Sequence, residues 1–219
     1  MFESFNPNVL LSTAYLAPIQ YYSKLVSYKN IYIEYSENYS KQSFRNRCCI
    51  LSSNGSLVLS IPVKRSNENK ILIKDIKIDN DSRWKDIHLR AIESAYRSSP
   101  YFIHYADDIF KIINIQAIYL IDLNNELQQK ICELLGIETT IQYTSDFKNI
   151  PFPYDDLSDA IHPKEKKKKP DSHFSPKSYY QVFRSKFGFV PNLRIIDLLF
   201  NMGPNSLEIL NSGICRLKI

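Results

Sequence analysis

Short β-type segments alternate with helical periodicity at the start of this chain. Residues 8–18, NVLLSTAYLAP, indicate a buried strand that runs into a loop. Residues 18–29, PIQYYSKLVSYK, have apolar residues at helical spacing, with Pro18 at the first helical position. Residues 31–36, IYIEYS, indicate a second short strand. This strand–helix–strand order is typical of an α/β protein.

Two further β-type segments follow. Within residues 42–64, Asn54-Gly55 lies between two β-rich arms. Because this pair is preferred in type I′ turns, the segment predicts a β-hairpin. Residues 70–79, KILIKDIKID, alternate Ile with Lys or Asp and predict a half-buried strand.

The remaining elements are predicted from periodicity and from turn and cap residues. The prediction comprises helices over residues 83–98, 100–113 and 123–135, the last closed by Gly136, strands over 115–121 and 137–145, and three short helical pieces within 178–210. Together these elements predict an α/β fold: a mixed β-sheet with flanking helices and a β-hairpin, and a helical C-terminal part.

The chain changes character after residue 145. Residues 146–177 hold five of the eleven prolines and a lysine-rich run. We therefore expect an α/β core domain over 1–145, a Pro/Lys-rich loop or linker over 146–177 that is mobile in part, and a helical C-terminal segment over 178–219 that packs on the core.

The positive charge of the chain is concentrated in one short segment. The net charge is +5, and residues 164–169 contribute five Lys and one Glu, or +4, which leaves about +1 for the rest. A nucleic-acid-binding face needs many phosphate contacts spread over a surface, so nucleic acid is disfavoured as a partner. A solvated or disordered segment is the simpler interpretation of the lysine run.

Cysteine and glycine usage narrows the possible chemistry. The four cysteines contain no CxxC pair, which favours free thiols in a reducing compartment. The five glycines are too far apart for a GxGxxG or P-loop site, so we expect no bound cofactor. The four His do not cluster with one another or with Cys, so we expect no metal. The N-terminal residues match neither a signal peptide nor a membrane span, and we expect a cytoplasmic protein.

Three clusters of residues are candidates for a site. On the helix predicted over 83–98, His88 lies between Trp84 and Ile92, one turn to each side. It is either a buried histidine held by a backbone carbonyl or a partly desolvated general base.

The second cluster is KQSFRNR, residues 41–47, in which Arg45 and Arg47 would share one face of a strand. Their forked guanidinium groups suit phosphate or carboxylate, although solvated edge charges explain them equally well. The third cluster is the strand-to-helix junction YLAPIQYY, with Tyr15, Gln20 and Tyr21. Such junctions at the carboxyl edge of a sheet are common ligand positions.

Several stretches resemble the WbqC-like protein family. The resemblance rests on YLAPIQYY, EYSENYSKQSFRNRCCI, LSIPVK, WKDIHLRAIESAYRSSPYF and PNLRIIDLLFNMGP, which occur in the expected order at both ends of the chain. The family motif positions among them are Tyr15, Pro18, Lys41, Arg45, Asn46, Arg47, Trp84, His88, Tyr96, Pro100 and Tyr101.

The resemblance implies a link with surface polysaccharide or O-antigen gene clusters, and so with nucleotide-sugar or amino-sugar chemistry. One hypothesis is an enzyme that modifies such a sugar, for example by acyl or aminoacyl transfer, with His88 as general base. Substrate would bind to Tyr15, Gln20, Lys41, Arg45, Asn46, Arg47, Trp84, Tyr96 and Tyr101. The alternative is a non-catalytic protein that binds a nucleotide-sugar or a glycosyltransferase or other glycan-biosynthesis partner.

Overall fold

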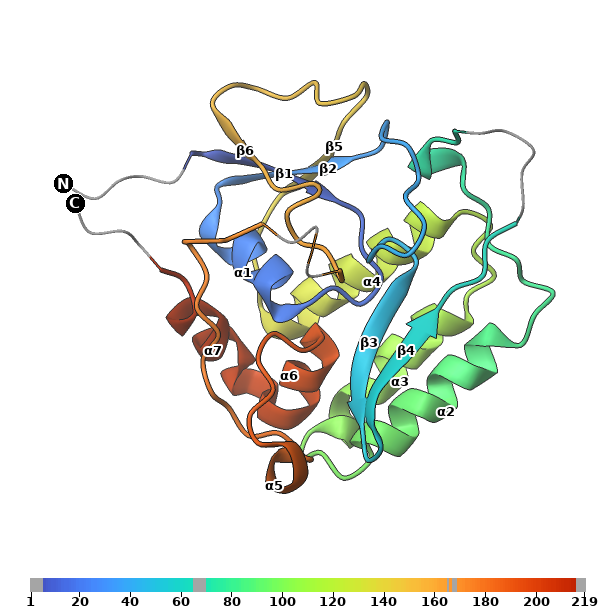
Figure 1. Cartoon of the computed structure of the whole chain (residues 1–219), viewed down its shortest axis with the longest axis vertical. Helices are drawn as coiled ribbons and strands as arrows, with labels where there is room; N and C mark the ends of the chain where they lie inside the picture. The colour runs from blue at the N-terminus through green and yellow to red at the C-terminus, as the bar shows by residue number, and fades with distance from the viewer. Residues whose placement is uncertain (1–5, 65–69, 165, 167–168, 216–219) are drawn as a thin grey trace.

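A four-stranded parallel sheet forms the centre of the structure, a computed structural model that describes residues 6–64, 70–164, 166 and 169–215. Its strand order is β5-β2-β1-β6 (Figure 1). The strands are β1 (Asn8–Ser12), β2 (Asn30–Glu34), β5 (Ile141–Tyr143) and β6 (Tyr154–Asp156). Every residue of β1 is buried, as expected for a strand inside a parallel sheet.

The order of the strands reverses beside β1. Helix α1 (Ile19–Ser27) carries the chain from β1 to β2 on one side, whereas β6 pairs with β1 on the other side. The loops that follow β1 and β6 therefore leave the same edge of the sheet next to each other. This is the topological switch point, where open α/β sheets usually bind ligands.

A separate hairpin consists of β3 (Arg47–Ser52) and β4 (Gly55–Ser60). The hairpin prediction is confirmed by their antiparallel register, in which Ser52 pairs with Gly55. The predicted type I′ turn is wrong. Ser53 and Asn54 are the central residues, and Gly55 at φ 103° follows them, whereas Asn54 lacks the positive φ that type I′ requires.

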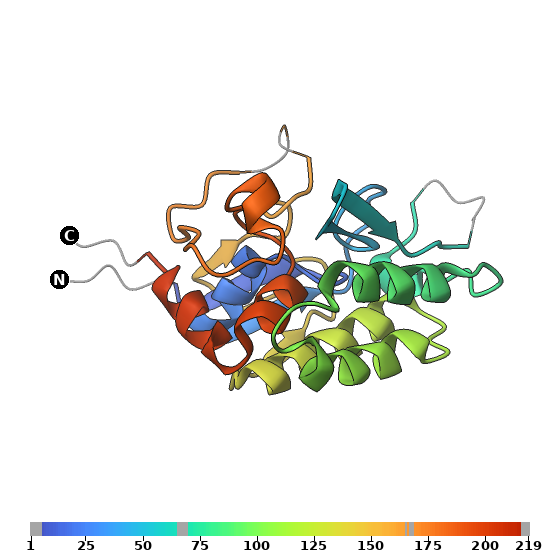
Figure 2. The ribbon, with the colours of Figure 1, turned by 90° about the horizontal axis from the view of Figure 1, so that it is seen from below.

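Three long helices follow, and all three were predicted. They are α2 (Trp84–Tyr96), α3 (Phe102–Asn114) and α4 (Leu120–Leu135), the last of which ends at Gly136 in the left-handed conformation. Helix α2 contacts both β3 and α3, and α3 contacts α4. Figure 2 shows the hairpin and α3 on opposite sides of α2.

Two predicted strands are absent from the described residues. Residues 70–79 contain a single 3₁₀ turn, η1 (Ile73–Asp75), and residues 115–121 run directly into α4. The alternation of Ile in the first segment does match burial, since Ile73, Ile76 and Ile78 are all buried. Their backbone, however, bonds to several different segments instead of to one neighbouring strand, so no ladder forms.

The C-terminal part is helical, as predicted, with α5 (Arg184–Phe187), α6 (Ile195–Met202), η3 (Gly203–Asn205) and α7 (Ser206–Ser212). Helices α6 and α7 contact α1, and α6 also contacts α3. Gly203 has φ 53°, and a Cβ there would lie 2.5 Å from the Tyr101 ring, so only glycine fits this contact.

The predicted loop over 146–177 contributes β6 to the central sheet. Three residues of the lysine run, 165, 167 and 168, lie outside the described residues. The proposed division at 145 and 177 therefore stays a prediction, with the added fact that the middle segment supplies an edge strand of the central sheet.

The α/β class is confirmed, with the parallel and antiparallel pairings in two separate sheets. All four cysteines are free thiols, as the sequence predicted. No helix among the described residues has both the length and the apolar character needed to span a membrane.

Candidate functional site

A small cavity of about 10 Å³, room for about one water molecule, lies at the switch point, between the loops that follow β1 and β6. Its lining comes from four segments that are distant in sequence: Ser12, Thr13 and Ala14; Tyr21; Phe44 and Arg45; and Leu157, Ser158 and Ile161. We call this the switch-point cavity. Of the residues predicted to bind substrate, it includes Arg45, and Tyr21 belongs to the predicted junction cluster.

The guanidinium of Arg45 is buried and paired with a carboxylate. Arg45 is 4% exposed and Glu37 is 6% exposed. Nε of Arg45 donates to Oε1 of Glu37 at 2.7 Å, and Nη2 donates to Oε2, which makes the contact bidentate. Burial alone would lower the pKa of Arg45, but the hydrogen bond and the charge of Glu37 raise it.

Two further groups complete the cluster around Arg45. Nη2 also donates to Oγ of Ser12 at 2.8 Å and lies 3.4 Å from Oδ1 of Asp159. The Asp159 side chain is 70% exposed, so this carboxylate faces solvent while Glu37 does not. Nη1 of Arg45 has no hydrogen bond to the described residues, which leaves its two N–H groups for a ligand.

Neighbouring elements fix the position of this cluster. The amide of Asn124 on α4 donates to Oγ1 of Thr13 at 3.1 Å and to the backbone carbonyl of Arg45 at 2.8 Å. Oγ of Ser12 donates to the carbonyl of Ser158 at 2.6 Å. Buried hydrogen bonds thus join the loops after β1 and β6 to the segment that carries Arg45.

A second, larger cavity of about 550 Å³ lies beside the first turn of α1. Its polar floor includes Gln20, Asp171 and Asn192, and its walls include Phe174 and three prolines. We call it the Gln20 cavity. Gln20, which the sequence predicted to bind substrate, is 4% exposed there.

His88 lies apart from both cavities, in the core between α2 and the hairpin. It is 2% exposed, its Nδ1 lies 2.8 Å from the hydroxyl of Tyr15, and the Trp84 ring packs against it at 5.1 Å between centroids. Burial lowers the pKa of His88 to about 4, and the Ser60 backbone opposes that shift. His88 is therefore neutral near pH 7, and its Nδ1 accepts a hydrogen bond from the Tyr15 hydroxyl.

The Tyr15 phenol is the matching donor. Tyr15 is fully buried, and burial raises its pKa well above the usual value, so its hydroxyl keeps its proton. This geometry agrees with the buried-histidine interpretation that the sequence analysis weighed. The general-base role of His88 stays a prediction.

The other predicted site residues are dispersed. Lys41 is exposed on a loop, and the amide of Asn46 donates to the carbonyl of Ile61 at 2.9 Å. Arg47 is half-buried at the start of β3, and its Nε has no partner among the described residues. Tyr96 is buried against Phe200, and Tyr101 packs on Gly203.

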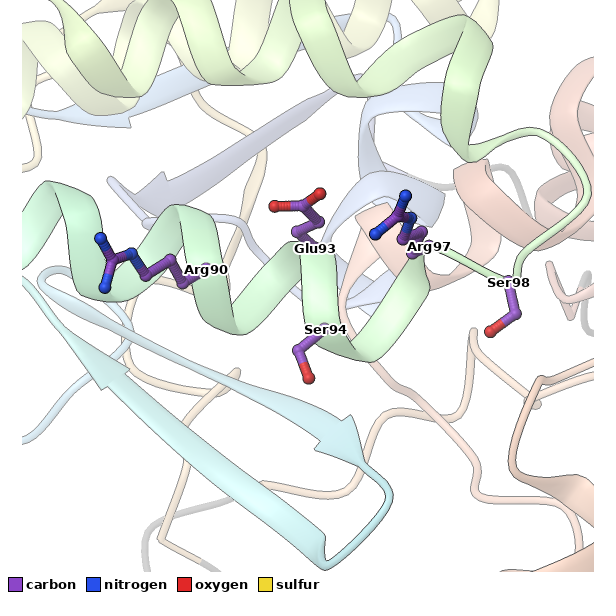
Figure 3. A pocket seen from close by; sticks show the side chains of 5 residues that line it. All are labelled: Arg90, Glu93, Ser94, Arg97 and Ser98. Atoms are coloured by element: carbon purple, nitrogen blue, oxygen red, sulfur yellow. The ribbon is translucent and has the colours of Figure 1, made fainter.

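A broad depression of about 580 Å³ also lies on the outer face of α2 and the turn after it. Figure 3 shows its five labelled side chains spread around the helix. They are Arg90, Glu93, Ser94, Arg97 and Ser98, all of them exposed. Since this depression contains no buried polar group and no predicted site residue, we do not place the site there.

Sequence reasoning missed Glu37, Ser12 and Asp159 at the switch-point cavity. Glu37 lies within the motif EYSENYSKQSFRNRCCI, eight residues before Arg45, and its opposite charge was the available signal. Nothing local marks Asp159, which lies 114 residues from Arg45 in the sequence. Within the described ranges, no group of three or more His, Cys, Asp or Glu could hold a metal ion.

Fold and cavity together define an α/β protein with a polar cavity at the switch point of its parallel sheet. The model of the WbqC-like protein family matches residues 13–161, and the chain belongs to that family. It is also 26% identical over 221 residues to the uncharacterised protein Rv1507c of Mycobacterium tuberculosis, covering 91% of this chain and 94% of the relative. No solved structure matches the chain.

Proposed function

We propose that the protein acts on a sugar or amino sugar in the biosynthesis of a surface polysaccharide, and that the amine of this ligand binds beside the exposed Asp159 carboxylate, at the outer side of the switch-point cavity. The main support is the charge of the cluster. Arg45 contributes +1, while Glu37 and Asp159 contribute −1 each, so the cluster sums to −1. A cluster of this charge attracts an ammonium group and repels phosphate. It therefore favours an amine over the phosphate or carboxylate first assigned to Arg45 and Arg47.

The polar groups in the cavity and beside it suit a single hydroxyl group of a sugar that lies at its outer side. Arg45 offers two free N–H donors at Nη1, and Asp159 offers carboxylate acceptors at the exposed side. Thr13 accepts from Asn124, which leaves its hydroxyl hydrogen free to donate. Sugar hydroxyl groups both donate and accept, so they match a cavity that presents both kinds of partner.

As an enzyme, the protein would catalyse acyl or aminoacyl transfer to the amine. A C–N bond forms, the leaving group departs from the acyl carbon, and a base takes the amine proton. Asp159 is the exposed carboxylate at the cluster, whereas His88 becomes reachable only if Tyr15 moves away from its Nδ1. We therefore propose Asp159 as the base and keep His88 as the alternative.

Non-catalytic binding of the same ligand is the second candidate function. The observation in its favour is that His88 is buried and its Nδ1 is bonded to Tyr15. Incubating glucosamine and acetyl coenzyme A with wild-type, Asp159→Asn and His88→Ala proteins separates the two functions. Full turnover in a folded His88→Ala variant would show that His88 is not the general base.

Thermal-shift titration with glucosamine, N-acetylglucosamine and glucose tests the proposal. A ligand that binds only the folded state raises Tm by mass action. We expect the largest rise with glucosamine, loss of that preference in Asp159→Asn, and no change in Asp107→Asn, a matched exposed aspartate on α3. Equal shifts with all three sugars would contradict amine recognition at this cluster.

A further inference from the structure

We propose that the Gln20 cavity binds the base and phosphate of a nucleotide. The inference rests on the proposed function in one respect, that the two cavities serve one ligand. The binding chemistry itself is argued from the Gln20 cavity alone.

The walls of the cavity suit a flat ring. Phe174, Pro170, Pro176, Val190 and Pro191 line it. Aromatic and proline rings present flat apolar faces, and any purine or pyrimidine can stack on them because every base has a π-face. At about 550 Å³, the cavity has the size typical of small-molecule sites.

The floor offers side-chain amides that can read the edge of such a ring. Oδ1 of Asn192 accepts from the backbone N–H of Gln20 at 2.9 Å, and Nδ2 of Asn192 donates to Oε1 of Gln20 at 3.1 Å. Nε2 of Gln20 donates to Oδ2 of Asp171 at 2.8 Å. Each amide nitrogen keeps a second hydrogen and each amide oxygen a second lone pair, so the paired amides present donors and acceptors together.

A buried lysine holds this floor in place. Nζ of Lys24 lies 2.6 Å from Oδ2 of Asp171, and the Lys24 side chain is 1% exposed. The backbone N–H of His173 also donates to Oδ1 of Asp171, at 3.0 Å. Because Asp171 is held from three directions, it fixes the orientation of the Gln20 amide before any ligand arrives.

The Gln20 cavity lacks the net negative charge of the cluster around Arg45. Among its lining residues Lys169 contributes +1 and Asp171 contributes −1, and Lys24 neutralises Asp171 from behind the lining. Lys24 is paired and buried, so exposed Lys169 at the rim is the cation available to a phosphate.

The two cavities lie next to each other. Gln20 and Tyr21 are consecutive residues of α1 and line different cavities. On the other side, the backbone N–H of Lys169 donates to the carbonyl of Ala160 at 3.2 Å, and Ala160 lies between Ser158 and Ile161 of the switch-point cavity. A nucleotide-linked amino sugar would therefore place its amine beside Asp159 and its phosphate beside Lys169.

Isothermal titration calorimetry with uridine and adenosine 5′-monophosphates tests the inference. Ribose 5-phosphate, which has no nucleobase, is the control. We expect at least one nucleotide to bind tenfold or more tightly than ribose 5-phosphate. Val190→Trp, which fills the cavity, should weaken that binding at least tenfold, and Lys169→Ala should weaken it several-fold and reduce its dependence on salt.

Two matched controls leave the cavity unchanged: Val58→Trp on the exposed face of β4 and Lys111→Ala on α3. Because Lys169 is exposed, its truncation tests the inference even if Val190→Trp fails to fold. Equal affinity for nucleotide and ribose 5-phosphate, or binding that survives both cavity variants, would overturn the inference.

The amino-sugar proposal and the nucleotide inference can be tested separately. Glucosamine binding should be lost in Asp159→Asn and kept in Val190→Trp, while nucleotide binding should show the reverse pattern. If the protein binds glucosamine but no nucleotide, only the nucleotide inference is contradicted.

Discussion

Arg45 and Arg194 are both buried arginines beside Phe44, yet their surroundings differ. Arg45 has a bidentate contact with Glu37 and a second carboxylate nearby. Arg194, at 6% exposure, stacks on the Phe44 ring at 4.1 Å and donates from Nε to the carbonyl of Cys49 at 3.2 Å. Its Nη1 has no partner among the described residues.

The difference shows two ways of burying a cation. At Arg45, the Glu37 carboxylate offsets the loss of hydration, and burial of the pair fixes the cluster at the cavity. At Arg194, burial lowers the pKa, and only a ring and a carbonyl offset the cost. We therefore expect the loss of charge to destabilise the protein more at Arg45 than at Arg194.

The largest effect is expected from Glu37→Gln. This change leaves the Arg45 guanidinium buried without a countercharge, and breaking a buried pair typically costs about 3–5 kcal/mol. Urea denaturation of wild type and variant measures the loss. The double variant Glu37→Gln/Arg45→Gln should cost less than the sum of the single variants, and strict additivity would show that the pair is not coupled.

The next effect concerns His88, a buried group that stays uncharged. Its folded pKa of about 4 lies below the usual 6.5, so the unfolded chain binds its proton first and stability falls as the pH drops from about 6.5 to 4. The full loss is on the order of 3 kcal/mol. His88→Gln should flatten this part of the stability–pH curve.

The measured quantity is the difference in free energy of unfolding between His88→Gln and wild type at each pH. The difference is needed because Asp197 changes stability with pH in the direction opposite to His88. Burial raises the pKa of Asp197 to about 6, so its contribution to stability is lost as the pH rises through 6. This contribution is common to both proteins and cancels. An unchanged slope in His88→Gln would mean that His88 is charged or exposed in the folded state.

A smaller effect is expected from Arg194→Met. It removes a cation–π contact and one hydrogen bond, but it also removes a buried cation that has no carboxylate partner among the described residues. We expect a loss below about 1 kcal/mol, compared with about 3 kcal/mol or more for Arg45→Met. Equal losses in the two variants, measured by urea denaturation, would break the comparison.

The smallest effect on stability is expected from Asp159→Asn. Its side chain is 70% exposed and its contact with Arg45 is 3.4 Å long, so the free energy of unfolding should change by less than about 0.5 kcal/mol. Amine binding should nevertheless be lost. A large stability loss would instead make Asp159 part of the buried pair.

Local signals in the sequence were sufficient for much of the fold. The hairpin, α2, α3 and α4 follow from turn residues, caps and 3.6-residue periodicity, which act within a few positions. The strand predicted over 70–79 failed because alternation reports burial alone. Whether a β-ladder forms depends on which distant segment lies alongside.

The site was predictable only in part, for the same reason. Arg45 and Gln20 were found from their residue types and motifs. Their partners were not, since Asp171 lies 151 residues and Asn192 lies 172 residues from Gln20 in the sequence. Hydrogen bonding across such separations depends on how distant segments pack together, which no local pattern encodes.

The late position of β6 has a consequence for synthesis. Strands β1, β2 and β5 end by Tyr143, but β6 and the loop after it, which complete the switch-point cavity, come later in the chain. A nascent chain that has emerged only as far as β5 holds Arg45 and Glu37 but lacks Ser158 and Asp159. The switch-point cavity and the cluster around Arg45 are therefore completed late in synthesis, when the fourth strand joins the sheet.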